Sequence, residues 1–274
     1  MIDLHTHSTY SDGTLTPAEL VAQAEKAGLT AIALTDHNTV QGLPEFIAAG
    51  EKSPVRTVPG IELSTEYEGI ELHILALFLK TEHYAPITAL LEDYRRRKEE
   101  SNLQLTRALC RAGMALDYGE IRAKSEGYVN RAVIGAEMTR KGYTASVAEA
   151  FKKYLEPGGG FYVPPRRPDT LETIGFVRSI GAVAVLAHPF LDLTEDRLRQ
   201  LLPKAREQGL AAMETVYSRY DENTSRLAAR LAEEFAILPS GGSDFHGENK
   251  PDIFLGRLQV EDTYLEMLEH GITS

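Results

Sequence analysis

The sequence has only one cysteine and no long apolar run, and both absences narrow its class. Cys110 has no second cysteine with which to form an internal disulfide, so the chain fits a reducing compartment. No apolar stretch approaches the roughly 20 residues that a membrane-spanning helix needs. The N-terminus also lacks the basic segment and apolar core of a signal peptide. We therefore expect a cytoplasmic protein with no membrane partner.

Positive charge is also scarce. The 274 residues include 29 Lys or Arg against 40 Asp or Glu, which gives a formal net charge of -11 at pH 7. Long nucleic acids are bound through many cations that contact phosphates, so this balance argues against long duplex nucleic acid as a partner. It leaves open a small phosphorylated substrate that a few local cations and metals could hold. The length suffices for one barrel-sized domain, or for one domain that carries an insertion.

The first stretch of the chain contains a candidate metal site. Residues 1–4 are expected to form a short buried strand, and His5 and His7 then project from the same side of an extended chain. Two imidazoles on one side can share a metal, although a His-x-His pair alone could equally arise by chance. Asp12 follows in a polar loop, and Thr16 and Pro17 predict the start of a helix. Barrels of alternating strands and helices place their chemistry at such strand ends.

Strands and helices alternate along most of the chain, with one interruption. The hydrophobic pattern predicts about seven strands joined by helices. Residues 84–164 break this alternation, because they predict one long helix over 86–113 followed by shorter helices. We therefore predict an α/β protein with a metal-binding domain formed by residues 1–83 and 165–274. The segment 84–164 is predicted to be a small all-helical insertion that caps the active site.

Nine possible metal ligands fall in, or just after, the predicted strands. They comprise six of the eight histidines and three carboxylates, namely His5, His7, Asp12, His37, Glu62, His73, His188, Asp244 and His246. Each alone is more often a hydrogen-bonded structural residue, but chance would place more histidines on helix surfaces, as with His83 and His270. A carboxylate or imidazole in an apolar strand is costly without a partner. The set predicts a multinuclear nitrogen and oxygen site for zinc, manganese or iron(II).

These ligands stand in motifs that resemble those of the polymerase and histidinol phosphatase (PHP) family. The motifs are His5-x-His7 with Ser11-Asp12-Gly13, Thr35-Asp36-His37, Pro59-Gly60-Ile61-Glu62, His73, Ala187-His188-Pro189 and Ser243-Asp244-x-His246. They cover residues 1–80 and 182–247. The resemblance implies the family's fold, a distorted seven-stranded (β/α) barrel, and its class of activity, metal-dependent phosphoester hydrolysis.

The resemblance also implies three divalent metal ions. The first would use His5, His7, Glu62 and Asp244. The second would share Glu62 as a bridge and add His73 and His188. The third would use Asp12, His37 and His246, with Asp12 at a position that is histidine in some members. Glu62, His188 and Asp244 are the expected catalytic residues. Two metals close together lower the pKa of a shared water to generate hydroxide, and they spread charge on the phosphoryl oxygens.

The helical block indicates a nucleotide substrate. It resembles the subgroup of PHP proteins that hydrolyse nucleoside 3′,5′-bisphosphates and 5′-phosphates such as AMP, some of which trim short RNA from its 5′ end. Asn130 as a helix N-cap, with Arg131 after it, would form an anion site. Lys153 adds a cation, and Tyr162 and Tyr217 could stack a base. Each of these residues could also be an ordinary surface residue.

Two other functions remain open at this point. A histidinol-phosphate phosphatase would use the same metals with a different pocket. A metal-dependent binding or regulatory module would need the metals but no site open to a substrate. The interpretation we favour is a metal-dependent hydrolase whose partner is a small phosphorylated molecule, namely a nucleotide or a short 5′-phosphorylated oligonucleotide.

Overall fold

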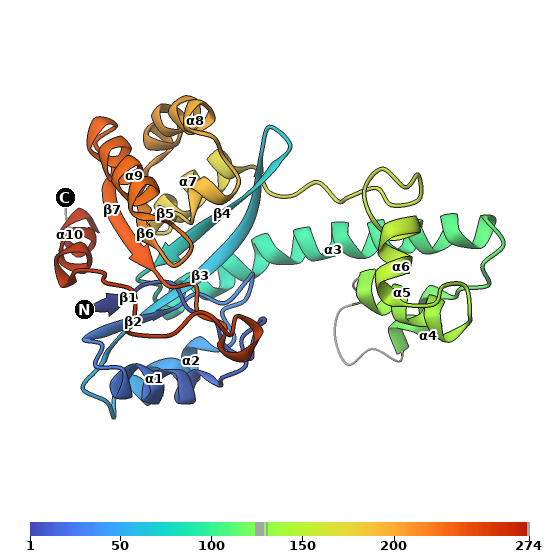
Figure 1. The fold of residues 1–274 in the computed structure, drawn as a ribbon, viewed down its shortest axis with the longest axis horizontal. Coiled ribbons are helices and arrows are strands. Elements are labelled where there is room, and N and C mark those ends of the chain that lie inside the picture. The colour runs from blue at the N-terminus through green and yellow to red at the C-terminus, as the bar shows by residue number, and fades with distance from the viewer. Residues whose placement is uncertain (124–128, 130, 273–274) are drawn as a thin grey trace. The chain divides into compact units, whose positions relative to one another are not determined.

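The computed structural model describes residues 1–123, 129 and 131–272 (Figure 1). The chain divides into two compact units. Residues 1–88 and 167–274 form one, which we call the barrel unit, and residues 89–166 form the other, which we call the helical unit. The segment predicted as an insertion was 84–164. Whether it caps the metal centre stays a prediction.

The barrel unit is built on one seven-stranded sheet whose strands follow each other in chain order. The strands are β1 Ile2–Asp3, β2 Ala31–Leu34, β3 Arg56–Tyr67, β4 Ile70–Leu77, β5 Val183–Leu186, β6 Leu210–Tyr217 and β7 Leu238–Gly242. Neighbours are parallel except at β4, which runs antiparallel to both β3 and β5. The ends of the sheet meet where Leu4 N–H donates to Gly241 O at 3.2 Å and Asp244 N–H donates to His5 O at 2.8 Å. The predicted distorted seven-stranded barrel is therefore confirmed.

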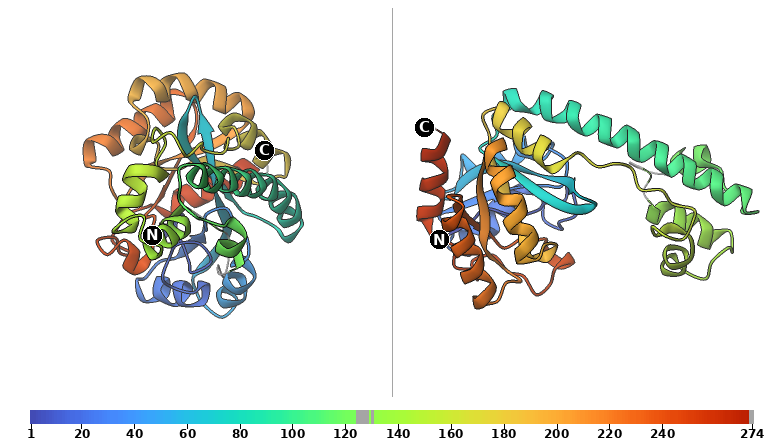
Figure 2. Two further views of the ribbon diagram at one scale, coloured as in Figure 1. Left: turned by 90° about the vertical axis from the view of Figure 1, so that its right-hand side faces the viewer. Right: turned by 90° about the horizontal axis from the view of Figure 1, so that it is seen from above.

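Helices surround these strands (Figures 1 and 2). They are α1 Pro17–Lys26, α2 Leu43–Gly50, α7 Thr170–Ser179, α8 Glu195–Gln208, α9 Glu222–Glu234 and α10 Asp262–Ile272, with short 3-10 turns at Pro189–Leu191 and Gly247–Asn249. A cluster of buried aliphatic side chains takes alternate strand residues, such as Val183 and Val185, because successive side chains of a strand point to opposite faces. Leu265 and Leu268 of α10 belong to the same cluster.

Local sequence signals set several element limits. Thr16 caps α1, since its side chain accepts from Glu19 N–H while the Glu19 carboxylate accepts from Thr16 N–H, and Pro17 is the first helical residue. This confirms the predicted helix start. The β3–β4 hairpin turns on two residues, Glu68 and Gly69, whose φ angles of 51° and 81° are those of the tight hairpin turn that matches strand twist.

The helical unit has a hydrophobic core of its own. Helix α3, Thr81–Arg111, begins in the barrel unit and continues into the helical unit. It is followed by α4 Tyr118–Ala123, α5 Arg131–Arg140, α6 Val147–Ala150 and a π-helical segment, Phe151–Leu155. Leu105, Leu109 and Ile134 are fully buried in one cluster with Met138 and Leu155. Burial of this apolar surface stabilises the unit as a separate packed body.

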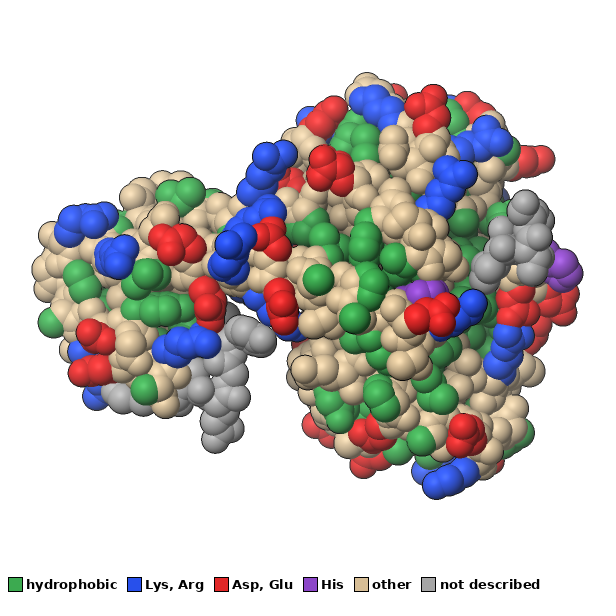
Figure 3. All heavy atoms as spheres, turned by 180° about the vertical axis from the view of Figure 1, so that it is seen from behind, with side chains coloured by type: hydrophobic (Ala, Val, Ile, Leu, Met, Phe, Trp, Pro, Cys, Tyr) green, Lys and Arg blue, Asp and Glu red, His purple; other side chains and the backbone are tan. Residues whose placement is uncertain are grey.

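Two surface properties bear on the expected partners. None of the helices in the described residues is both long and apolar enough to cross a membrane. On the face shown in Figure 3, acidic and basic side chains are interspersed over both units.

Candidate metal centre

All nine predicted ligands lie together in the barrel unit. They form four overlapping groups, and within each group the candidate ligand atoms lie within 4.8 Å of one another. The groups are His7, Asp12, His37 and His246; His5, His7 and Asp244; His5, Glu62 and His188; and His37, Glu62 and His73. Because these groups share members, the arrangement is consistent with a polynuclear metal site.

Glu62 on β3 is the shared centre of the site, and its carboxylate is almost fully buried. Its Oε2 faces three imidazoles, at 3.2 Å from His5 Nε2, 3.2 Å from His7 Nε2 and 3.0 Å from His37 Nδ1. Its Oε1 lies 2.8 Å from His73 Nδ1 and 3.1 Å from His188 Nε2. A carboxylate with imidazoles at both oxygens has the placement of a bridging ligand.

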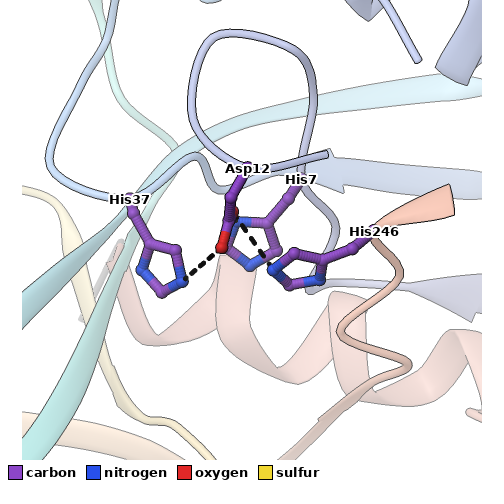
Figure 4. Close-up of side chains that lie close together, drawn as sticks. All are labelled: His7, Asp12, His37 and His246. Carbon is purple, nitrogen blue, oxygen red and sulfur yellow. Dashed lines mark ion pairs between the residues drawn. The ribbon is translucent and has the colours of Figure 1, made fainter. Parts of the chain in front are cut away.

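Asp12 gathers a second set of imidazoles (Figure 4). Its Oδ1 lies 3.2 Å from His246 Nε2 and 3.7 Å from His7 Nδ1, and its Oδ2 lies 3.8 Å from His37 Nε2. Asp12 is about half exposed, whereas His7 and His246 are buried. This side of the site is therefore the one at which a ligand carboxylate meets solvent.

The loop that carries Asp12 is fixed by a buried carboxylate, Asp36. Ser8 donates to it from both its backbone N–H and its hydroxyl, each at 2.7 Å, and the Ser11 hydroxyl donates at 2.6 Å. Asp36 follows β2, whereas Asp12 follows β1, so these bonds hold one strand-end loop against the next. This explains why the Thr35-Asp36-His37 motif contains an aspartate beside its histidine.

Asp244 presents one oxygen to the site and anchors the other. Its Oδ1 lies 3.3 Å from both His7 Nε2 and His246 Nδ1, while its Oδ2 accepts from the Tyr217 hydroxyl at 2.8 Å and from Lys250 Nζ at 2.6 Å. Tyr217 is only 2% exposed. The predicted use of Tyr217 as a base platform is therefore corrected, because its ring is buried and its hydroxyl supports Asp244.

Unusual backbone conformations occur at these strand ends. Asn38, His188 and Asp244 have φ angles of 52°, 28° and 59°, in the left-handed region that most side chains avoid. Such strain persists at functional sites where the surroundings determine it. A Cβ on Gly242 would lie 2.3 Å from His5 Cβ, so only glycine lets β7 come this close to the first ligand.

The buried charges shift one another's pKa values. Burial opposes ionisation of Glu62, but His5 and His37 outweigh it and hold the pKa of Glu62 well below its usual range. Burial likewise opposes protonation of His73, yet the Glu62 carboxylate raises its pKa to about 10. The pKa of Asp244 is lowered against the effect of burial, chiefly by His5. Without metal, the site therefore keeps protons that a divalent cation would displace.

The donor atoms fit divalent metals. Among the described residues, several buried site atoms form no hydrogen bond, including His5 Nε2, His7 Nδ1 and Nε2, His37 Nδ1, Glu62 Oε2 and His188 Nδ1. A buried polar atom without a partner is expensive, and here several of them converge. Imidazole nitrogen with carboxylate oxygen suits zinc, manganese or iron.

The predicted substrate residues lie in the helical unit, apart from Tyr217. Arg131 begins α5, donates from Nη1 to Leu155 O at 2.9 Å and places its guanidinium carbon 4.4 Å from the centre of the Tyr162 ring. Lys153 forms an exposed ion pair with Glu149 at 2.5 Å. Asn130 lies outside the described residues. The structure therefore brings Arg131 and Tyr162 together, and leaves Lys153 on a solvated helix face.

Among the residues that contact the ligands, sequence reasoning missed Glu214 and Lys250. Glu214 lies in β6 and accepts from His5 Nδ1 at 2.9 Å and from His188 N–H at 2.6 Å. Glu214 could have been found by the same signal that singled out Glu62, namely a carboxylate within an apolar strand. Lys250 lies in an irregular polar stretch and carried no such signal.

Comparison with known proteins agrees with this geometry. The family model described as PHP domain matches residues 3–163. The chain is 33% identical to a 5′-3′ exoribonuclease of Haemophilus influenzae over 89% of each chain. It is 29% identical to a 3′,5′-nucleoside bisphosphate phosphatase of Chromobacterium violaceum over 92% of this chain and 90% of that one. A solved metal-dependent phosphoesterase from Bifidobacterium adolescentis superposes with a TM-score of 0.74 at 26% identity, covering 98% of this chain and 96% of that one.

The fold and the site thus define a metal-dependent phosphoesterase. The chain belongs to the PHP family, as the resemblance of its motifs implied. Its class is hydrolase, so the alternative of a non-enzymatic binding module is set aside.

Replacement of the central carboxylate tests the ligand assignment. We expect Glu62→Gln to lose bound metal and nearly all turnover while the protein keeps its fold, because the amide cannot act as a charged bridge. Elemental analysis of the purified variant gives the metal content, and circular dichroism reports the fold. Glu66→Gln, on the same strand but outside the four groups, is the matched control. Full metal content with intact activity in Glu62→Gln would contradict the assignment.

The stability of the metal-free protein should depend on pH. The raised pKa of His73 contributes stability that is fully present below its ordinary value of 6.5 and is lost as the pH rises toward about 10. The lowered pKa of Glu62 contributes in the opposite sense, so its share is lost only in acid. The urea concentration at the unfolding midpoint of chelator-treated protein should therefore decrease as the pH is raised from 6.5 to about 10. His73→Gln should flatten that fall, and a midpoint that rises over the same window would refute the reasoning.

Proposed function

We propose that this enzyme hydrolyses phosphate esters of nucleotides. Its substrates would be nucleoside 3′,5′-bisphosphates, which it converts to 5′-monophosphates, and the 5′ end of short RNA. The observation that supports the proposal is the cluster around Glu62, in which the nine candidate ligands form four overlapping groups. It is supported by two relatives, named as an exoribonuclease and a nucleoside bisphosphate phosphatase, that align over most of their lengths.

The proposal places three divalent ions in the cluster. His5, His7, Glu62 and Asp244 would hold the first; Glu62, His73 and His188 the second; and Asp12, His37 and His246 the third. His7 Nδ1 also lies 3.7 Å from Asp12 Oδ1, so this ring contacts residues that would hold the first and the third ion. Divalent metals here would act as Lewis acids. They would lower the pKa of bound water toward neutrality and neutralise charge on the phosphoryl oxygens.

The side chains of the site have separate tasks in this scheme. Glu62 remains charged because imidazoles surround both of its oxygens. Asp244 keeps Oδ1 directed at His5 and His7, because Tyr217 and Lys250 hold its other oxygen. His188 would bind metal from a strained backbone position just after β5. Such preorganised charge costs no rearrangement when the phosphoryl group reacts.

Recognition of the nucleotide is assigned to the helical unit. Arg131 lies against the faces of Tyr162 and Phe151, at 4.4 Å and 5.5 Å from the ring centres, so a cation and aromatic surface occur together. Phosphate binds a guanidinium well, and bases stack on aromatic or guanidinium planes. Arg131 and Tyr162 are therefore the proposed contacts, with Asn130 and Lys153 as further candidates.

A panel of substrates tests the proposal. With Mn²⁺ or Zn²⁺ supplied, we expect conversion of adenosine 3′,5′-bisphosphate to AMP and stepwise shortening of 5′-phosphorylated RNA oligonucleotides. Histidinol phosphate and p-nitrophenyl phosphate should react more slowly, and duplex DNA very little, because the acidic chain gains little from long strands. Time courses on end-labelled RNA give the direction. A preference for histidinol phosphate, or cleavage inside long strands, would favour a different pocket.

Substitution of Arg131 separates recognition from chemistry. If its guanidinium binds a substrate phosphate, Arg131→Ala should lower kcat/KM for nucleotides about ten- to a hundred-fold, since a hydrogen bond to a charged group is worth about 1.5–3 kcal/mol. Turnover of p-nitrophenyl phosphate should change little. Arg140→Ala, at the other end of α5, is the matched control. Equal losses on both substrates would indicate that Arg131 acts by holding Leu155 and Tyr162 in place.

A further inference from the structure

We propose that Glu214 is a positioning residue that fixes the two ligands on either side of Glu62. It lies on β6 with 0% exposure. Its Oε1 is 2.9 Å from His5 Nδ1, and its Oε2 accepts from His188 N–H at 2.6 Å. One carboxylate thus binds the ring of one predicted ligand and the backbone of another. This inference rests on the metal assignment in the proposed function but not on its substrate.

The contact with His5 determines which ring nitrogen faces the metal centre. When Nδ1–H donates to Glu214, the lone pair of the ring is on Nε2. That nitrogen lies 3.2 Å from Glu62 Oε2 and 3.7 Å from Asp244 Oδ1. A carboxylate behind a metal-binding imidazole fixes its tautomer and orientation and makes it a better donor. The geometry at His5 has this form.

The contact with His188 holds a strained backbone. His188 has φ 28° and ψ 51°, a conformation that a non-glycine residue adopts only when its surroundings favour it. A charge-assisted bond from its N–H to Glu214 offsets part of that cost. The same conformation sets His188 Nε2 at 3.1 Å from Glu62 Oε1. Glu214 therefore acts on both oxygens of the central carboxylate through two different ligands.

The local strand geometry and charge also point to the metal site. The pairing of β6 with β7 shifts register between Glu214 and Val216, and such a bulge re-aims a side chain. Within the described part of the chain, the one ion-pair partner found for Glu214 is His5, with no Lys or Arg beside it. A fully buried carboxylate without a fixed cation is costly. Divalent cations beside Glu62 would provide the missing positive charge.

The test measures metal affinity without substrate. Glu214→Gln keeps the volume but replaces one acceptor oxygen with a donor, so one of the two N–H groups loses its partner. We expect its affinity for Zn²⁺ and Mn²⁺, measured by competition with a chelator, to fall about ten- to a hundred-fold. Glu66→Gln is the matched control, because Glu66 is a carboxylate on β3 that belongs to none of the four ligand groups. That control should keep the wild-type affinity.

The structural alternative makes a different prediction. A residue that only supports the fold would lower the urea midpoint of the metal-free protein and leave the affinity of the folded molecules unchanged. That outcome, or an equal loss in Glu66→Gln, would overturn the inference. Should Glu214→Gln fail to fold, Glu214→Asp retains the charge but is too short to reach both N–H groups, and its affinity should also fall. A wild-type protein that binds metal but rejects nucleotides would refute only the proposed substrate.

Discussion

The structure depends on a carboxylate that water cannot reach. Glu62 is buried, and two of its imidazole neighbours lie on the strand-end loop after β1 while others come from the far side of the barrel. A buried charge is expensive unless it is matched, and here the matching groups are themselves ionisable and buried. The strands that carry these residues must therefore pack closely against one another. This close approach requires a glycine at position 242, beside His5. It also requires left-handed backbone conformations at several strand ends.

Most of the barrel and the ligand set could be predicted from the sequence. The reason is that buried strands leave apolar runs, and that His and Glu in or after such runs are conspicuous. Thr16, Pro17 and the Glu68–Gly69 turn set element limits through interactions within a few residues. Such local signals do not depend on the rest of the fold, so they can be interpreted without it.

What could not be predicted depends on contacts between distant segments. Glu214 reaches His5 from 209 residues away, and only the register of β6 against its neighbours directs its carboxylate there. Tyr217 was predicted to stack a base, but its hydroxyl donates to Asp244 Oδ2. The pattern of β6 shows that both residues lie in a strand, but a one-residue slip reverses which face each occupies.

The charge distribution explains how an acidic protein can bind a phosphorylated substrate. The acidic side chains of the site would not repel an anion as free carboxylates do, because histidines and Lys250 lie beside them and divalent metals bound there would neutralise them further. The field of the whole molecule would then disfavour long polyanions, whereas the terminal phosphate of the proposed substrate would meet a compensated centre. Arg131 and Tyr162, the proposed substrate contacts, belong to a unit with a separate core, so their substitution is expected to leave the metal centre intact. In the proposed scheme, chemistry and selectivity belong to different parts of one chain.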